Sequence, residues 1–166
     1  MPAIQAGVKA PDINLPLLDG REFSLAHARA SGPVVVAFFK ISCPVCQLAF
    51  PYIERIYQAY GRSGKVTFAG VSQDNAKDTA AFNRTFGVSF PTLLDAQGKY
   101  PASNAYKITN VPSIFLISPE GEVEMSIVGW SKQEMEQLAR TLADVTGDAP
   151  MPVVQAEEKV PDYKPG

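Results

Sequence analysis

The chain has 166 residues and a formal net charge of −2, and hydrophobic residues make up 46% of it. This length and composition predict one globular domain of ordinary size with a sizeable core. The lysines and arginines are scattered and form no basic stripe, which argues against nucleic acid as a partner. No run of about 18 or more apolar residues is present, so the sequence predicts no membrane span.

The first residues, MPAIQAGVK, lack the basic and apolar regions of a signal peptide. We therefore expect a cytoplasmic protein if this is the native start, and a periplasmic or otherwise extracytoplasmic one if a leader has been removed. The only cysteines are Cys43 and Cys46. Two cysteines so close together do not form the disulfide scaffold of a small secreted domain.

Turn signals divide the first part of the chain into a hairpin and a short helix. Residues 12–15 and 22–25 are expected to pair across the Asp19-Gly20 turn. Ser24 is expected to cap a short helix that reaches Ala30.

The remainder alternates apolar runs with segments of helical spacing. The run at 34–39 predicts a strand buried on both faces, as in a parallel sheet. Pro51 is expected to kink the helix that follows. Further expected elements, in chain order, are a helix at 43–60, a strand at 66–72, a helix at 75–86, an extended piece at 91–95 with a Gln97-Gly98 turn, a helical turn or two at 101–107, strands at 113–118 and 123–129, and a helix from 131 to about 145. The order β-α-β-α-β-β-α predicts an α/β fold with helices on both faces of the sheet.

Prolines recur after residue 148, and helical or strand periodicity is lost there. We therefore expect one domain at 1–147, followed by an extended or disordered tail at 148–166.

The motif Cys43-Pro44-Val45-Cys46 lies where a buried strand joins a helix. The first cysteine falls at the helix N-terminus, where free N–H groups and the helix dipole favour a thiolate, the form that attacks disulfides. The second cysteine lies almost one turn further, within reach of the first sulfur and shielded from solvent. We predict that Cys43 attacks a disulfide and that Cys46 resolves the mixed intermediate. Pro44 suits the first turn of the helix and stiffens the loop.

Three other interpretations of the pair stay open. The cysteines could be half of a zinc site, for which His27 is the further ligand that the chain offers. They could be a structural staple, although so short a loop constrains the unfolded chain little. They could also be ordinary small core residues.

Val111-Pro112 stands just before the strand at 113–118. A cis peptide bond is plausible here, because cis bonds are essentially confined to X-Pro. A trans proline that begins the strand is the alternative.

Together these features resemble the thioredoxin superfamily and, within it, the TlpA/ResA-like redoxin branch related to AhpC/TSA proteins. The resemblance covers residues 8–146. It rests on Ala10-Pro11-Asp12, the run at 34–39, the cysteine motif, Phe50-Pro51-Tyr52, residues 87–91, and Val111-Pro112-Ser113 with the residues up to Gly121. The resemblance implies a thioredoxin-like fold, in which helices flank a central mixed sheet and a β-hairpin extends the N-terminus. It also implies thiol–disulfide oxidoreductase activity.

Site roles follow from the same resemblance. Pro112 would be a cis-proline packed against the disulfide, and the backbone of Val111 would pair with an extended substrate segment. The residues Pro44 and Val45 inside the motif would influence the redox potential, and Lys40 could stabilise the thiolate. No bound cofactor or metal is expected. The expected partners are protein thiol or disulfide substrates and a reducing or oxidising protein, with the chain itself a monomer.

Three positions depart from the family pattern, and the departures at Ala37 and Ala49 concern proton transfer. Ser42 replaces the usual tryptophan before the first cysteine, Ala37 replaces a buried aspartate, and Ala49 replaces the glutamate of ResA-like members. A buried thiol without a nearby base keeps a raised pKa, so resolution by Cys46 could be slow or rely on water. Glu54 lies about 12 Å further along the helix and is a poor substitute.

Two competing functions remain. In a peroxiredoxin-like thiol peroxidase, Cys46 would be the peroxidatic thiol and Cys43 the resolving one. However, Phe39 and Cys43 replace the proline and the hydroxyl residue of that motif, and Arg84 would be the supporting arginine only by default. The other competing function is a non-catalytic module that binds peptides in the groove near Pro112.

Overall fold

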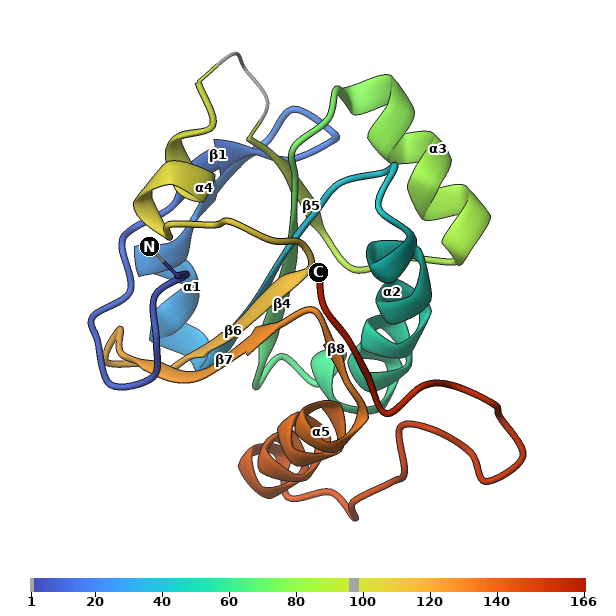
Figure 1. Ribbon diagram of the computed structural model, residues 1–166. Coiled ribbons are helices and arrows are strands. Elements are labelled where there is room, and N and C mark those ends of the chain that lie inside the picture. Colours follow the sequence, from blue (N-terminus) through green and yellow to red (C-terminus); the bar gives the residue numbers. More distant parts are fainter. Residues whose placement is uncertain (1, 96–98) are drawn as a thin grey trace.

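A five-stranded mixed sheet lies at the centre of the computed structural model, which describes residues 2–95 and 99–166. The strand order is β5-β4-β3-β6-β7 (Figure 1). β3 pairs in parallel with β4 and antiparallel with β6, while β5 extends the parallel side and β7 the antiparallel side. The strands are β3 (Val34–Phe39), β4 (Thr67–Ser72), β5 (Thr92–Leu94), β6 (Ser113–Ile117) and β7 (Val123–Val128). The expected Gln97-Gly98 turn lies outside the described residues.

The apolar run of β3 forms the centre of two separate cores. Successive side chains of a strand point to opposite faces of the sheet. Val35, Ala37 and Phe39 therefore pack in one core with α2 (Pro44–Ile56) and α5 (Lys132–Thr146). The alternate side chains, Val34, Val36 and Phe38, pack in the other core with the N-terminal residues and α4. This explains why the strand carries no polar position.

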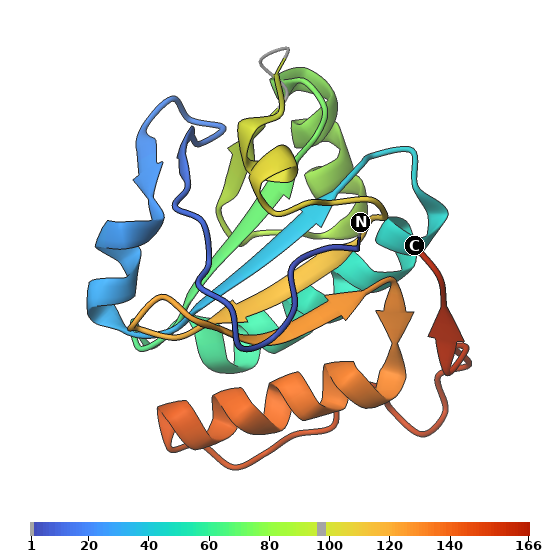
Figure 2. The ribbon, with the colours of Figure 1, turned by 60° about the vertical axis from the view of Figure 1, so that its left-hand side comes forward.

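Helices cover both faces of the sheet, as expected (Figures 1 and 2). On one side lie α2, the π-helical turn η2 (Tyr57–Gly61) that continues it, α3 (Ala76–Phe86) and α5. On the other side lie α1 (Leu25–Ala28), the 3-10 turn η1 (Arg29–Ser31), α4 (Pro101–Ala105) and the hairpin of β1 (Asn14–Pro16) and β2 (Glu22–Ser24). The α/β fold is thioredoxin-like, with the N-terminal hairpin present.

Two helices begin at the polar N-caps that the sequence predicted. The Ser24 hydroxyl accepts a hydrogen bond from the backbone N–H of His27 at 3.2 Å, and the Ser131 hydroxyl accepts one from Glu134 at 3.2 Å. Such caps satisfy N–H groups that have no partner within the helix. Gly147 ends α5 in the left-handed conformation that glycine adopts without strain.

Residues 148–166 form no helix and pack against the rest of the protein. Val153 and Val154 are buried in the core that contains α2 and α5. Further along, β9 (Tyr163–Lys164) pairs antiparallel with β8 (Trp130–Ser131). No periodic pattern in the sequence indicated these contacts.

None of the helices among the described residues is both long and apolar enough to cross a membrane.

Candidate active site

Cys43 is the N-cap residue of α2, with Pro44 in the first helical turn. Its Sγ accepts a hydrogen bond from the backbone N–H of Cys46 at 3.4 Å and donates one to the Val111 carbonyl oxygen at 3.3 Å. The first contact suits a thiolate and the second a thiol, so both protonation states of Cys43 have a partner. The helix dipole adds a further preference for negative charge at this position.

The Val111–Pro112 peptide bond is cis, the form considered from the sequence. The loop is held on both sides, because the backbone N–H of Gly129 donates to the Pro112 carbonyl oxygen at 2.8 Å and the Ser113 hydroxyl donates to Asn110 at 2.7 Å. These bonds fix the Val111 carbonyl opposite Cys43.

Cys46 lies behind Cys43 and has no solvent-accessible surface. Burial raises the pKa of the Cys46 thiol far above its ordinary value. The backbone of Lys40 opposes this effect, and the neighbouring Cys43 and, to a smaller extent, Asp74 add to it. Ala37 and Ala49 belong to the same buried cluster, so neither position supplies a carboxylate. Glu54 is engaged elsewhere, where it accepts hydrogen bonds from the 89–90 backbone.

Asp74 is a site residue that the sequence reasoning missed. Its Oδ2 accepts a hydrogen bond from the backbone N–H of Ile41 at 2.8 Å and so fixes the loop between β3 and α2. Asp74 follows β4, which is parallel to β3, and the carboxyl ends of parallel strands meet at one edge of a sheet. The polar pair Gln73-Asp74 just after the second buried strand was therefore the available signal.

A cavity of about 280 Å³ opens beside Cys43. Its lining includes Lys40, Cys43, Gln73, Asn110, Val111 and Gly166. Lys40 and Val111 thus line the same cavity as Cys43. Gln73, Asn110 and Gly166 were not anticipated. Gln73 follows β4 directly and carries the same signal as Asp74, whereas nothing in the local sequence distinguishes Asn110 and Gly166.

The remaining candidates lie apart from this cavity. His27 is exposed on α1, and Arg84 is exposed on α3. Pro44 is exposed at the start of α2, and Val45 packs partly buried against the core. Within residues 2–95 and 99–166, no three His, Cys, Asp or Glu side chains are grouped as metal ligands.

The fold, the cysteine pair and the relatives reported below together define the class of the protein, a thioredoxin-like thiol–disulfide oxidoreductase. Residues 6–126 match the model of the AhpC/TSA family, and the chain belongs to that family. The resemblance inferred from the sequence motifs is thereby confirmed.

Relatives with curated names support the ResA-like branch. The chain is 32% identical over 136 residues to the thiol-disulfide oxidoreductase ResA of Geobacillus thermodenitrificans, over 81% of this chain and 76% of that protein. It is 29% identical over 134 residues to ResA of Bacillus subtilis, over 80% of this chain and 73% of that protein.

Solved structures share the fold. The thioredoxin domain of a thiol-disulfide oxidoreductase from Bacteroides vulgatus superposes with a TM-score of 0.73 at 24% identity, over 87% of this chain and 99% of that chain. A peroxidoxin from Mycobacterium tuberculosis gives a TM-score of 0.69 at 20% identity, over 87% of this chain and 97% of that chain. At these identities the likeness describes the fold and does not separate the two chemistries.

Proposed function

We propose that Cys43 is the attacking thiol and Cys46 the resolving thiol of a dithiol–disulfide exchange with protein substrates. The observation that supports this assignment is the difference between the two sulfurs. Cys43 lines an open cavity at a helix N-terminus, while Cys46 is fully buried one turn behind it. A substrate disulfide reaches only the first sulfur.

The exchange proceeds in two balanced steps. The Cys43 thiolate attacks one sulfur of a substrate disulfide, forms a mixed disulfide and releases a substrate thiolate, which takes a proton from water. Cys46 then loses its proton to water and attacks the Cys43 sulfur. This step forms the Cys43–Cys46 disulfide and releases the second substrate thiolate. Two electrons pass from the protein dithiol to the substrate disulfide, and the reverse sequence oxidises a substrate dithiol.

Substrate placement is proposed to use the backbone beside the cis-proline. The Val111 carbonyl lies next to the Cys43 sulfur, so an extended polypeptide that pairs with this backbone would place its disulfide at the attacking atom. The hydrogen bond from Gly129 to the Pro112 carbonyl oxygen holds this loop in place, and Lys40 lends positive charge to the rim of the cavity. A reducing or oxidising partner protein would reset the cysteine pair through the same surface.

Single serine variants test the order of attack. Cys46→Ser is expected to accumulate a one-to-one mixed disulfide with a protein substrate, visible by mass spectrometry, because the first step remains and the second is lost. Cys43→Ser is expected to form no adduct and to fall to the rate of the double variant Cys43→Ser/Cys46→Ser. A stable adduct on Cys46 in the Cys43→Ser variant would reverse the assignment.

A peroxidase function requires an exposed thiolate of low pKa at Cys46. The burial and raised pKa of Cys46 oppose this requirement. We expect hydrogen peroxide to oxidise the reduced protein no faster than an ordinary free thiol. Thiol counting measures the rate of oxidation. If hydrogen peroxide oxidised the protein orders of magnitude faster than a small disulfide does, Cys46 would instead be identified as a peroxidatic cysteine.

A further inference from the structure

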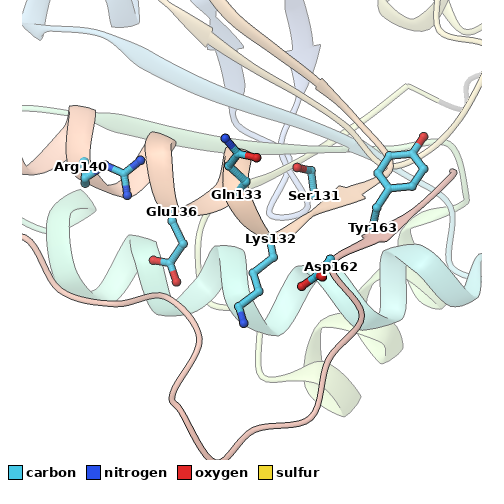
Figure 3. Close-up of a pocket in the computed structure, with 7 residues that line it drawn as sticks. All are labelled: Ser131, Lys132, Gln133, Glu136, Arg140, Asp162 and Tyr163. Atoms are coloured by element: carbon cyan, nitrogen blue, oxygen red, sulfur yellow. The ribbon is translucent and has the colours of Figure 1, made fainter.

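Residues 161–166, here called the strap, are bound along β8 beside the active site. Lys164 pairs with Trp130 and Tyr163 with Ser131 in an antiparallel ladder. Two hydrogen bonds extend the contact, from the Lys132 backbone N–H to the Asp162 carbonyl oxygen at 2.9 Å and from the Trp130 indole N–H to the Pro161 carbonyl oxygen at 2.6 Å. Figure 3 shows Asp162 and Tyr163 beside Ser131 and Lys132, where α5 begins.

Residue 166 of the strap lies beside Cys43, the thiol that we propose to attack the substrate. The Gly166 carbonyl oxygen accepts a hydrogen bond from the Asn110 side chain at 2.9 Å, and Gly166 lines the cavity that contains Cys43. In both ribbon views this end of the chain lies beside the start of α2 (Figures 1 and 2). The backbone approach is so close that a Cβ atom on Gly166 would lie 2.6 Å from the Val111 carbonyl oxygen.

A second glycine permits a similarly close approach of the strap. A Cβ atom on Gly129 would lie 2.4 Å from the Lys164 carbonyl oxygen, and Gly129 has a φ of +78°. The strap therefore touches the backbone of two segments at the site, Gly129 and Val111. The Val111 backbone is the edge that we proposed for an extended substrate, so strap and substrate compete for one place.

The anchor of the strap is separate from the strap itself. Glu158 forms two hydrogen bonds with the Arg55 guanidinium, at 2.7 and 3.1 Å, and accepts a third from the Tyr52 hydroxyl at 3.1 Å. Further along the chain, Tyr163 of the strap is 60% exposed. The strap can thus leave the site while Glu158 keeps the preceding residues in place.

We propose that the strap selects substrates by shape, an inference that rests on the proposed function. Small disulfides reach Cys43 through the open cavity with the strap in place. Extended polypeptides can pair with the Val111 backbone only after residues 164–166 have moved away. The strap thereby reserves the site for polypeptides that bind more tightly than the chain's own segment.

The first test compares the full chain with a chain that ends at Val160, which keeps the Glu158 anchor. Two probes are used, hydroxyethyl disulfide and a pair of unstructured peptides joined by one disulfide. If the strap is open in about a tenth of molecules, its removal lowers the KM for the peptide disulfide about tenfold. The kcat for the peptide and the rate with hydroxyethyl disulfide are expected to stay the same. Equal acceleration of both probes, or no change with either, would overturn the proposal.

Point variants of the full chain provide a matched pair. Gly166→Ala adds a Cβ that would lie too close to the Val111 carbonyl oxygen. This variant is therefore expected to lower the KM for the peptide, as the chain that ends at Val160 does. Tyr163→Ala changes only an exposed side chain and keeps the backbone ladder, so its KM is expected to equal that of the unmodified protein. A larger effect of Tyr163→Ala than of Gly166→Ala would contradict the backbone competition.

The second test works on the full chain and does not depend on shortening it. In the Cys46→Ser variant, Cys43 is linked by a disulfide either to the peptide or to mercaptoethanol. Nuclear Overhauser contacts between Gly166 and Val111 are expected to vanish in the peptide adduct and to persist in the mercaptoethanol adduct. Persistence in the peptide adduct would overturn the strap proposal. If Cys43 formed neither adduct, the proposed function itself would be wrong.

Discussion

At the scale of single residues, burial controls the second half of the reaction. The raised pKa of Cys46 leaves its thiolate scarce at neutral pH. Below that pKa the thiolate fraction grows about tenfold per pH unit, so resolution of a mixed disulfide on Cys43 should accelerate by that factor and continue to do so past about pH 9. Stopped-flow decay of an aromatic mixed disulfide measures this rate. A plateau near pH 8.5, where an ordinary thiol ionises, would contradict the prediction.

Ala49 offers a direct way to supply the missing base. It is buried in the cluster that contains Cys46, and a carboxylate there could take the thiol proton. We expect Ala49→Glu to accelerate resolution at neutral pH about a hundredfold, a typical contribution of a positioned base. The larger side chain should lower the free energy of unfolding by about 1–3 kcal/mol through overpacking.

Ala49→Gln is the matched control, since it adds the same volume without a base. It should show a similar loss in denaturant unfolding and no acceleration. If glutamine accelerates the step as much as glutamate does, the effect comes from repacking and the proton argument fails.

At the scale of elements, Glu158 joins the segment 148–166 to α2. The Arg55 guanidinium and the backbone N–H of Gln155 lower the pKa of Glu158 to about 2, from an ordinary value of 4.5. A depressed folded-state pKa stabilises the native contact above the ordinary value, and this contribution is lost as the pH falls toward the folded value. The contact should therefore hold at neutral pH and loosen in strong acid.

Hydrogen exchange tests this loosening. The Gln155 amide, which donates to Glu158 at 2.7 Å, should lose protection between about pH 5 and pH 2, after correction for intrinsic exchange. Amides of β3 serve as the control for global unfolding. In Glu158→Gln the Gln155 amide should be weakly protected at every pH, and a retained pH dependence in that variant would assign the effect to another group.

At the scale of the whole molecule, we propose a domain at 1–147 that residues 148–166 reinforce. Val153 and Val154 are 2% and 6% exposed in the core between α2 and α5. Full burial of a valine side chain contributes about 1.5–3 kcal/mol, so a chain ending at Gly147 should lose about 3–6 kcal/mol of stability. Chemical denaturation of the two chains measures the difference. Equal midpoints would show that the segment adds nothing to the fold.

The features that the sequence predicted are those that depend on residues close together in the chain. The features that it missed depend on contacts between residues far apart in the chain. β3 was predicted because six consecutive apolar residues suffice to identify a strand buried on both faces, and the Ser131 cap because its partner lies three residues away. The cysteine pair was likewise local. Asp74, Asn110 and Gly166 reach the site only through the topology of the sheet and the path of the last segment. The short pair Val153-Val154 carries no periodic pattern that could indicate its burial.

The position of Gly166 has a practical consequence for anyone who purifies the protein. An affinity tag fused after this residue would begin at the rim of the cavity that contains Cys43. Depending on its sequence, such a tag would pull the preceding residues away from Val111 or press further polypeptide against it. A comparison of reaction rates before and after cleavage of such a tag would show whether polypeptide attached at Gly166 alters access to Cys43.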